Sequence, residues 1–172
     1  MLPIGSRRLL ALLTLTAACL PGCGDMPRDP HETFERARGG IIRVGYTVNP
    51  PWVSIVEEGD RTEPAGIEPR LLAGLARRIG GRIEWRFDSE TRLIESLERR
   101  ELDVLIGGFK DSTPWSKKAG LTRPFARVDG DRHVMLVPQG ENRWLLELDR
   151  FLKSSEAEIK RQDRESIDNR RE

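Results

Sequence analysis

The sequence has little of what cross-linked, metal-binding or nucleic-acid-binding proteins need. Its 172 residues include 2 cysteines and 2 histidines, and 29 basic residues are balanced by 28 acidic ones. Because both cysteines lie near the N-terminus, the rest of the chain offers no disulfide and no cysteine-based metal site. The balanced charge gives no reason to expect nucleic acid as a partner. A mean hydropathy of −0.52 predicts a soluble globular body and excludes a multi-span membrane protein.

One short apolar run does occur, at the N-terminus. It extends from Leu9 to Leu20, follows Arg7 and Arg8, and is too short to cross a bilayer as a helix. A basic start, a short apolar middle and small residues after it are typical of a secretory signal peptide, and a buried core helix is the alternative. We therefore expect residues 1–22 to be a signal peptide that is removed.

Both cysteines fall at the end of this run, in segments that resemble a bacterial lipobox. Residues 20–23 predict lipidation at Cys23, and Cys19 is the competing position. A cysteine is needed because its thiol can be alkylated to a thioether that carries the diacyl chains, and each buried CH₂ contributes about 0.8 kcal/mol to membrane binding. A disulfide between the two cysteines is the alternative. The pattern predicts a protein of the bacterial cell envelope, on the periplasmic side and lipid-anchored to a membrane.

Composition divides the rest of the chain into three parts. Residues 23–40 are rich in proline and charge and have little apolar content, so we expect a tether between anchor and domain. Residues 41–160 carry the apolar patterns of a folded body. Residues 161–172 are charged and aperiodic, which predicts a disordered tail.

The folded body shows strand and helix patterns in alternation. Apolar and β-branched runs predict strands at 41–48, 82–87, 102–107 and 133–138, and helical periodicity predicts helices at 66–79, after Ser89, and from 142 to about 160. Residues 108–130 are looser. The order strand, helix, strand, helix, strand implies a parallel sheet with right-handed crossovers. The expected fold class is α/β, a mostly parallel sheet of about four to five strands with helices on both faces.

Four segments, taken in order, resemble the first lobe of the family 3 extracellular solute-binding proteins, which have the type II periplasmic binding protein fold. The segments are an opening strand with a Pro-Pro-aromatic turn, a Gly-initiated helix, a helix followed by an Asp-Val-Leu-Ile-Gly-Gly strand, and a Thr-Pro segment before Arg-Pro-Phe (42–52, 66–71, 93–108 and 112–125). The resemblance implies binding of amino acids or similar small polar solutes for an ABC importer.

The chain departs from this family in two ways. Phe125 runs almost directly into the strand at 133–138 and the final helix, so the family's second lobe is expected to be absent and a ligand would have one wall only. The family's ligand-binding arginine would fall at Trp115 or Ser116, and its stacking aromatic near Glu90. Lys117 or Lys118 could partly substitute for the arginine as a point charge.

The candidate ligand-binding residues are Trp52, Gly107, Gly108, Ser112 and Thr113. Trp52 could be a stacking platform at the edge of a cleft, or it could cap the core. The two glycines end a buried strand, where ligands of open α/β sheets bind, or they form a tight turn.

Trp115 is a further candidate, as the anchor of a protein partner. Packing against the final helix is the alternative that we favour for it. Lys110 and Asp111, which precede Ser112, add polar groups at the same place in the sequence.

These patterns predict binding rather than catalysis. The folded body holds one histidine, no phosphate-binding glycine loop and no clear pair of catalytic carboxylates, so no cofactor, metal or enzyme activity is expected. The first hypothesis is a lipid-anchored protein that binds a small polar, amino-acid-like solute in support of a membrane transporter. The alternative is a single-lobe interaction, sensor or accessory lipoprotein that has lost ligand binding and contacts another envelope protein.

Overall fold

The computed structural model describes residues 27–58 and 61–155. The signal peptide expected over 1–22, the lipidation positions Cys19 and Cys23, and the tail expected over 161–172 lie outside the described residues. The elements, in chain order, are α1 (Thr33–Ala37), β1 (Ile41–Tyr46), β2 (Ser54–Glu58), β3 (Arg61–Ala65), α2 (Ile67–Ile79), β4 (Arg82–Phe87), α3 (Glu90–Glu98), β5 (Val104–Ile106), the 3₁₀ helix η1 (Pro114–Lys117), β6 (Ala119–Leu121), β7 (Ala126–Val128), β8 (Asp131–His133), β9 (Leu136–Pro138) and α4 (Asn142–Ser154).

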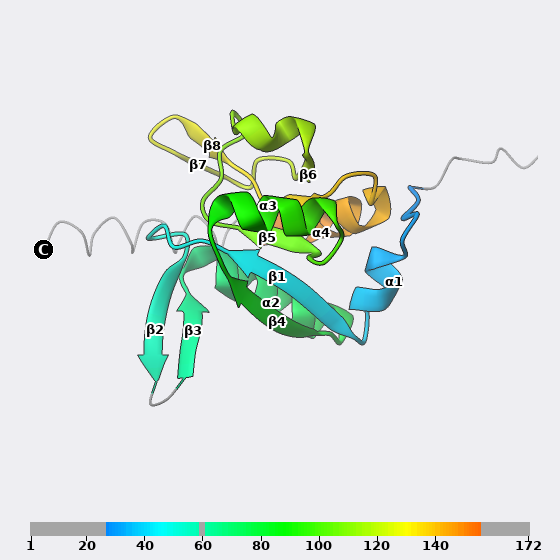
Figure 1. Ribbon diagram of the computed structural model, residues 1–172, viewed down its shortest axis with the longest axis horizontal. Coiled ribbons are helices and arrows are strands. Elements are labelled where there is room, and N and C mark those ends of the chain that lie inside the picture. Colours follow the sequence, from blue (N-terminus) through cyan, green and yellow to red (C-terminus); the bar gives the residue numbers. More distant parts are fainter. Residues whose placement is uncertain (1–26, 59–60, 156–172) are drawn as a thin grey trace, which may run out of the picture.

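A five-stranded sheet forms the centre of the fold, with the strand order β4-β1-β5-β9-β6 (Figure 1). β1 is parallel to β4 and to β5, whereas β9 is antiparallel to β5 and to β6. Four of these strands therefore run in one direction and β9 runs against them. This confirms the predicted α/β class and its mostly parallel sheet.

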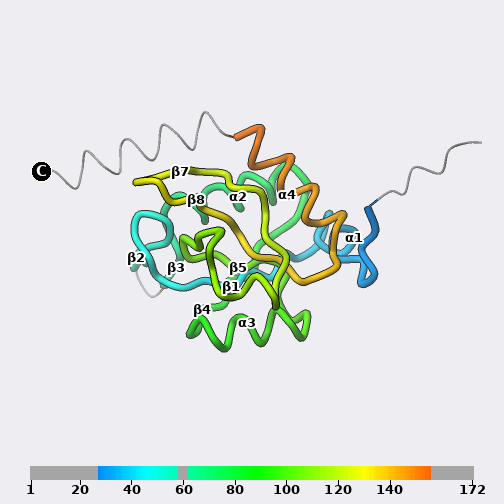
Figure 2. Tube along the Cα trace, turned by 90° about the horizontal axis from the view of Figure 1, so that it is seen from above, coloured from blue at the N-terminus to red at the C-terminus, as the bar shows by residue number. Residues whose placement is uncertain are grey.

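Helices cover both faces of the sheet, as the sequence predicts. Leu71, Leu72 and Leu75 form the buried stripe of α2 and pack in one cluster with α1 and α4. Leu93 and Leu97 of α3 pack in a second cluster on the other face. Figure 2 shows α3 on one side of β1 and β5, with α2 and α4 on the other. The sheet thus lies between two separate hydrophobic clusters.

Residues 29–40 belong to the folded unit, so the expected tether is wrong for this part of the chain. Asp29 accepts hydrogen bonds from the backbone N–H groups of Arg143 (2.8 Å) and Trp144 (3.0 Å), which caps the first turn of α4. Buried Phe34 lies in the first core cluster. Arg36 reaches Asp103 at 2.5 Å, next to the start of β5. Carboxylates provide part of this attachment, and an apolar pattern does not reveal these polar contacts.

Two further features differ from the sequence-based expectation. β2 and β3 form an antiparallel hairpin that projects from the body (Figure 1), where no strand was expected. The strand expected at 133–138 is two strands: β8 pairs with β7 in a separate ribbon, and β9 joins the central sheet. Within the described residues, no helix has the length and apolar character needed to span a membrane.

Candidate functional site

The carboxyl ends of β1 and β5 meet at one edge of the sheet, where Gly107 and Gly108 follow β5. The side-chain amide of Asn49 donates to the carbonyl of Gly107 at 2.9 Å. Gly108 has a φ of 68°, and a Cβ there would lie 2.4 Å from Cδ1 of Trp52. Only glycine fits this position without strain, because both the backbone conformation and the indole exclude a side chain. We call Trp52, Gly107, Gly108, Ser112 and Thr113 the rim.

Trp52 lies over this turn as a packed side chain rather than an open platform. It is 5% exposed and stacks on the ring of His133 with 3.9 Å between centroids. A second aromatic contact is edge-on with Phe125, with 5.9 Å between centroids. The Nδ1 atom of His133 lies 3.2 Å from the carbonyl oxygen of Gly108, which ties this stack to the turn. Trp52 therefore supports the Gly107–Gly108 turn, and a solute would reach little of its ring.

Glu68, in the first turn of α2, fixes the same turn from the other side. Its Oε2 accepts hydrogen bonds from the N–H groups of Gly107 (2.8 Å) and Gly108 (3.0 Å). Its Oε1 is buried and has no hydrogen-bond partner among the described residues. Burial raises the pKa of Glu68 from 4.5 to about 7, and the two backbone hydrogen bonds only partly oppose this effect. The backbone of the rim is thus held by a carboxyl group that titrates near neutral pH.

Ser112 and Thr113 follow on the loop after β5. Ser112 is exposed, whereas the hydroxyl of Thr113 accepts a hydrogen bond from the N–H of Trp115 and caps η1. Two ion pairs fasten the loop to β8: Lys110 to Asp131 at 2.6 Å, and Asp111 to Arg132. The loop is therefore polar and anchored.

Trp115 and Glu90 occupy the positions where the resemblance places a ligand-binding arginine and a stacking aromatic. The indole Nε1 of Trp115 donates to Oε1 of Glu90. Trp115 is half-buried and packs on the cluster of α3, so the expected packing against the final helix is wrong. Lys118 is paired with Glu98 at 3.0 Å, whereas Lys117 is exposed and has no ion pair with any described residue. Lys117 is therefore the lysine whose charge is open to a solute.

Sequence reasoning missed the roles of Glu68, Asn49 and His133 at the rim. A glutamate at the second position of a helix and a Gly-Gly pair after a buried strand are each common features. Only the packing of α2 against β5 brings the carboxylate to the two glycines. Across residues 27–58 and 61–155, no group of three or more His, Cys, Asp or Glu side chains could hold a metal ion.

The sequence profile of the bacterial extracellular solute-binding proteins, family 3, matches residues 42–169. The chain belongs to this family. No curated protein sequence gives a significant match.

Solved structures of similar fold include binding proteins of this kind. The arginine-bound form of domain 1 from TmArgBP, as its Phe57Trp mutant, has 22% identity and a TM-score of 0.63, with 71% of this chain and 96% of that chain covered. The P235GK mutant of ArgBP from T. maritima has 13% identity and a TM-score of 0.67, with 79% and 99% covered. An amino acid ABC transporter substrate-binding protein from Streptococcus pneumoniae, bound to L-arginine, has 9% identity and a TM-score of 0.66, with 78% and 96% covered. At these identities the likeness shows the fold alone.

Proposed function

We propose that this solute-binding family 3 protein is a lipid-anchored envelope protein that binds a small polar, amino-acid-like solute at the rim in support of a membrane transporter. The observation that carries the proposal is the Gly107–Gly108 turn at the carboxyl end of β5, held in place by Glu68. Solutes bind at this end of open α/β sheets. Ser112, exposed on the loop after β5, supplies a polar group at this end. Exposed Lys117 lies farther along the chain in η1, and its carbonyl accepts a hydrogen bond from Gln139 just after β9. In this proposal Lys117 attracts the solute's carboxylate as a point charge.

Thermal denaturation with a panel of solutes tests the proposal. The chain from Gly24 on, which contains every described residue, is melted with each of the twenty amino acids and with small polyamines. A ligand present at about 100 times its Kd stabilises the folded state by about 2.7 kcal/mol and raises Tm. A solute that raises Tm in the wild type, with a smaller rise in Lys117→Ala, would support the proposal. No rise for any solute at millimolar concentration would refute it.

A second function is favoured by the contact between Trp115 and Glu90. These side chains bind each other where the family resemblance places ligand contacts, and Trp52 is buried. Under this alternative the protein is an interaction, sensor or accessory lipoprotein without a solute. This alternative predicts that the wild type captures an envelope protein and that no solute changes its Tm.

A further inference from the structure

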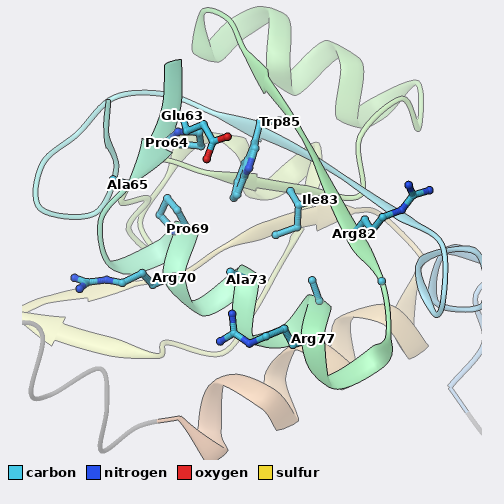
Figure 3. A pocket seen from close by; sticks show the side chains of 12 residues that line it. Glu63, Pro64, Ala65, Pro69, Arg70, Ala73, Arg77, Arg82, Ile83 and Trp85 are labelled. Atoms are coloured by element: carbon cyan, nitrogen blue, oxygen red, sulfur yellow. The ribbon is translucent and has the colours of Figure 1, made fainter. Parts of the chain in front are cut away.

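A groove of about 550 Å³ lies between α2, β3 and β4, apart from the rim (Figure 3). It shares no lining residue with the rim. Its size falls in the range of about 300–1,000 Å³ that is common for binding sites. The lining includes Glu63 of β3, Pro69, Arg70, Ala73 and Arg77 of α2, and three residues of β4 described below.

The floor of the groove is apolar. Ile83 and Trp85 of β4 are half-buried and pack against the first core cluster. Figure 3 shows both side chains turned toward α2, where Pro69 and Ala73 face them. A flat indole beside small apolar residues suits an apolar or aromatic side chain of a ligand.

The outer border of this groove is positively charged. Arg70, Arg77 and Arg82 are exposed, and none of them forms an ion pair with a described residue. Arg70 donates one hydrogen bond, to the carbonyl of Gly66 at 3.1 Å. Against these three guanidinium groups, Glu63 is the one acid among the lining residues. Guanidinium groups bind carboxylates through paired N–H donors, so the charge favours an acidic ligand.

The groove also borders an open strand edge. β4 lies at the end of the central sheet, and β1 is its partner on one side. No described strand pairs with its other edge. A six-residue edge presents a row of backbone donors and acceptors to which an extended peptide can add as another strand.

In the register centred on the middle of β4, its charges disfavour a second copy of this chain as the occupant. Antiparallel self-pairing centred on Glu84 would place Glu84 opposite Glu84 and Arg82 opposite Arg86. Like charges directly opposite each other in a sheet are destabilising. An acidic strand would be attracted by Arg82 and Arg86, although Glu84 between them would repel a carboxylate placed directly opposite it.

We propose that the α2–β4 groove binds an extended acidic segment of another envelope polypeptide, which adds to β4 as a strand. Alternate side chains of a strand point to opposite faces. Its apolar residues would contact Ile83 and Trp85, while its carboxylates on the other face would pair with Arg82. Arg70 and Arg77 add attraction at the outer border. The proposal does not depend on solute binding at the rim.

The test uses fluorescence anisotropy with a library of labelled peptides roughly ten residues long, in which Asp or Glu alternates with Val, Ile or Phe. The protein is the chain from Gly24 on. We expect saturable binding, weakened about tenfold by Arg77→Glu and by Arg82→Glu. Arg127→Glu is the matched control, because Arg127 is also exposed and has no ion pair with a described residue, but lies on β7. A peptide of the same charge with proline at alternate positions should not bind, since proline cannot donate to a strand ladder.

Each other result would overturn the proposal. The first three are that no peptide in the library binds, that Arg77→Glu and Arg127→Glu lose equal peptide affinity, or that the proline peptide binds as well as the others. The fourth is that phenylacetate displaces the peptide fully. The last is that light scattering shows dimerisation through β4 without peptide binding. A groove that takes phenylacetate would be a small-anion site, and dimerisation would make this face a contact between copies. Circular dichroism of each variant confirms that it is folded. A failure here leaves the Tm response to solutes unchanged, so the two proposals are separable.

Discussion

The indole N–H of Trp115 donates to the carboxylate of Glu90, and this bond joins η1 to the first turn of α3. A solute that entered between these elements would have to displace it. The contact is exposed, so its contribution to stability is small, about 0.5–1.5 kcal/mol. Breaking this bond would therefore cost a solute little free energy.

Glu90→Ala should strengthen the response to solutes. The substitution removes the acceptor of Trp115 without touching the core, so Tm without ligand should change little. A solute that raises Tm in the wild type should raise it further in Glu90→Ala. Glu98→Ala is the matched control, because Glu98 is also exposed on α3 but pairs with Lys118 instead. An equal or weaker response in Glu90→Ala would contradict this role for the contact.

Glu68→Gln should flatten the pH dependence of stability. The folded pKa is about 7, against an ordinary value of 4.5. The unfolded chain therefore releases this proton at lower pH than the folded chain does. The contribution of Glu68 to the free energy of unfolding is full below about pH 4.5 and is lost as pH rises through about 7, a change on the order of 3 kcal/mol.

Urea denaturation at about pH 4.5 and about pH 8 measures this difference. The wild type should lose more stability than Glu68→Gln between the two pH values. Glu95→Gln, an exposed change on α3, serves as the control and should follow the wild type. If the wild type and Glu68→Gln change in parallel, the carboxyl group does not titrate as the burial implies.

Gly108→Ala should destabilise the fold by about 2–4 kcal/mol, because the new Cβ meets the indole of Trp52 and the positive φ is strained. Gly130 is the matched control: its φ is 88° and a Cβ there meets nothing within 4 Å. Gly130→Ala should therefore cost only the backbone strain, about 1 kcal/mol. Equal losses in the two variants, measured by urea denaturation, would show that Trp52 does not pack on this turn as described.

Cys23→Ser should abolish membrane anchoring of the chain. If Cys23 carries the lipid, wild-type protein expressed in a bacterium should sediment with membranes and Cys23→Ser should not. Mass spectrometry of the purified N-terminus should show a diacylated cysteine in the wild type. Cys19→Ser is the control and should keep the anchor. If Cys19→Ser loses the anchor and Cys23→Ser keeps it, Cys19 is the lipidated residue.

The elements with periodic apolar patterns were predictable from the sequence. Their predicted ends lie close to the ends in the structure. The helix that ends before Gly80 and the strands at 82–87 and 102–107 carry apolar residues at regular spacing, and each is present in the structure. The β2–β3 hairpin was not predictable, since its second strand contains Pro64 and charged residues that have low strand propensity. The segment around α1 was missed because Asp29 and Asp103 attach it through hydrogen bonds and ion pairs.

Of the candidate site, the sequence predicted the position of the glycines and not their contacts. The Gly107–Gly108 pair was predicted to follow a buried strand, and it does follow β5 in the structure. The sequence left open whether Trp52 forms a platform or caps the core. The structure shows it buried against His133 and Phe125, which come from distant parts of the sequence. The contact of Trp115 with Glu90 likewise joins residues that are 25 positions apart. Such contacts depend on how the elements pack, which no local pattern encodes.

NMR spectroscopy of the ¹⁵N-labelled chain with pooled amino acids and polyamines at millimolar concentration tests solute binding at the rim most directly. If a solute binds at the rim, the amide signals of Gly107, Gly108, Ser112 and Thr113 should shift in a saturable way, while those of β4 should not. No shift with any pool, or shifts confined to the α2–β4 groove, would contradict solute binding at the rim.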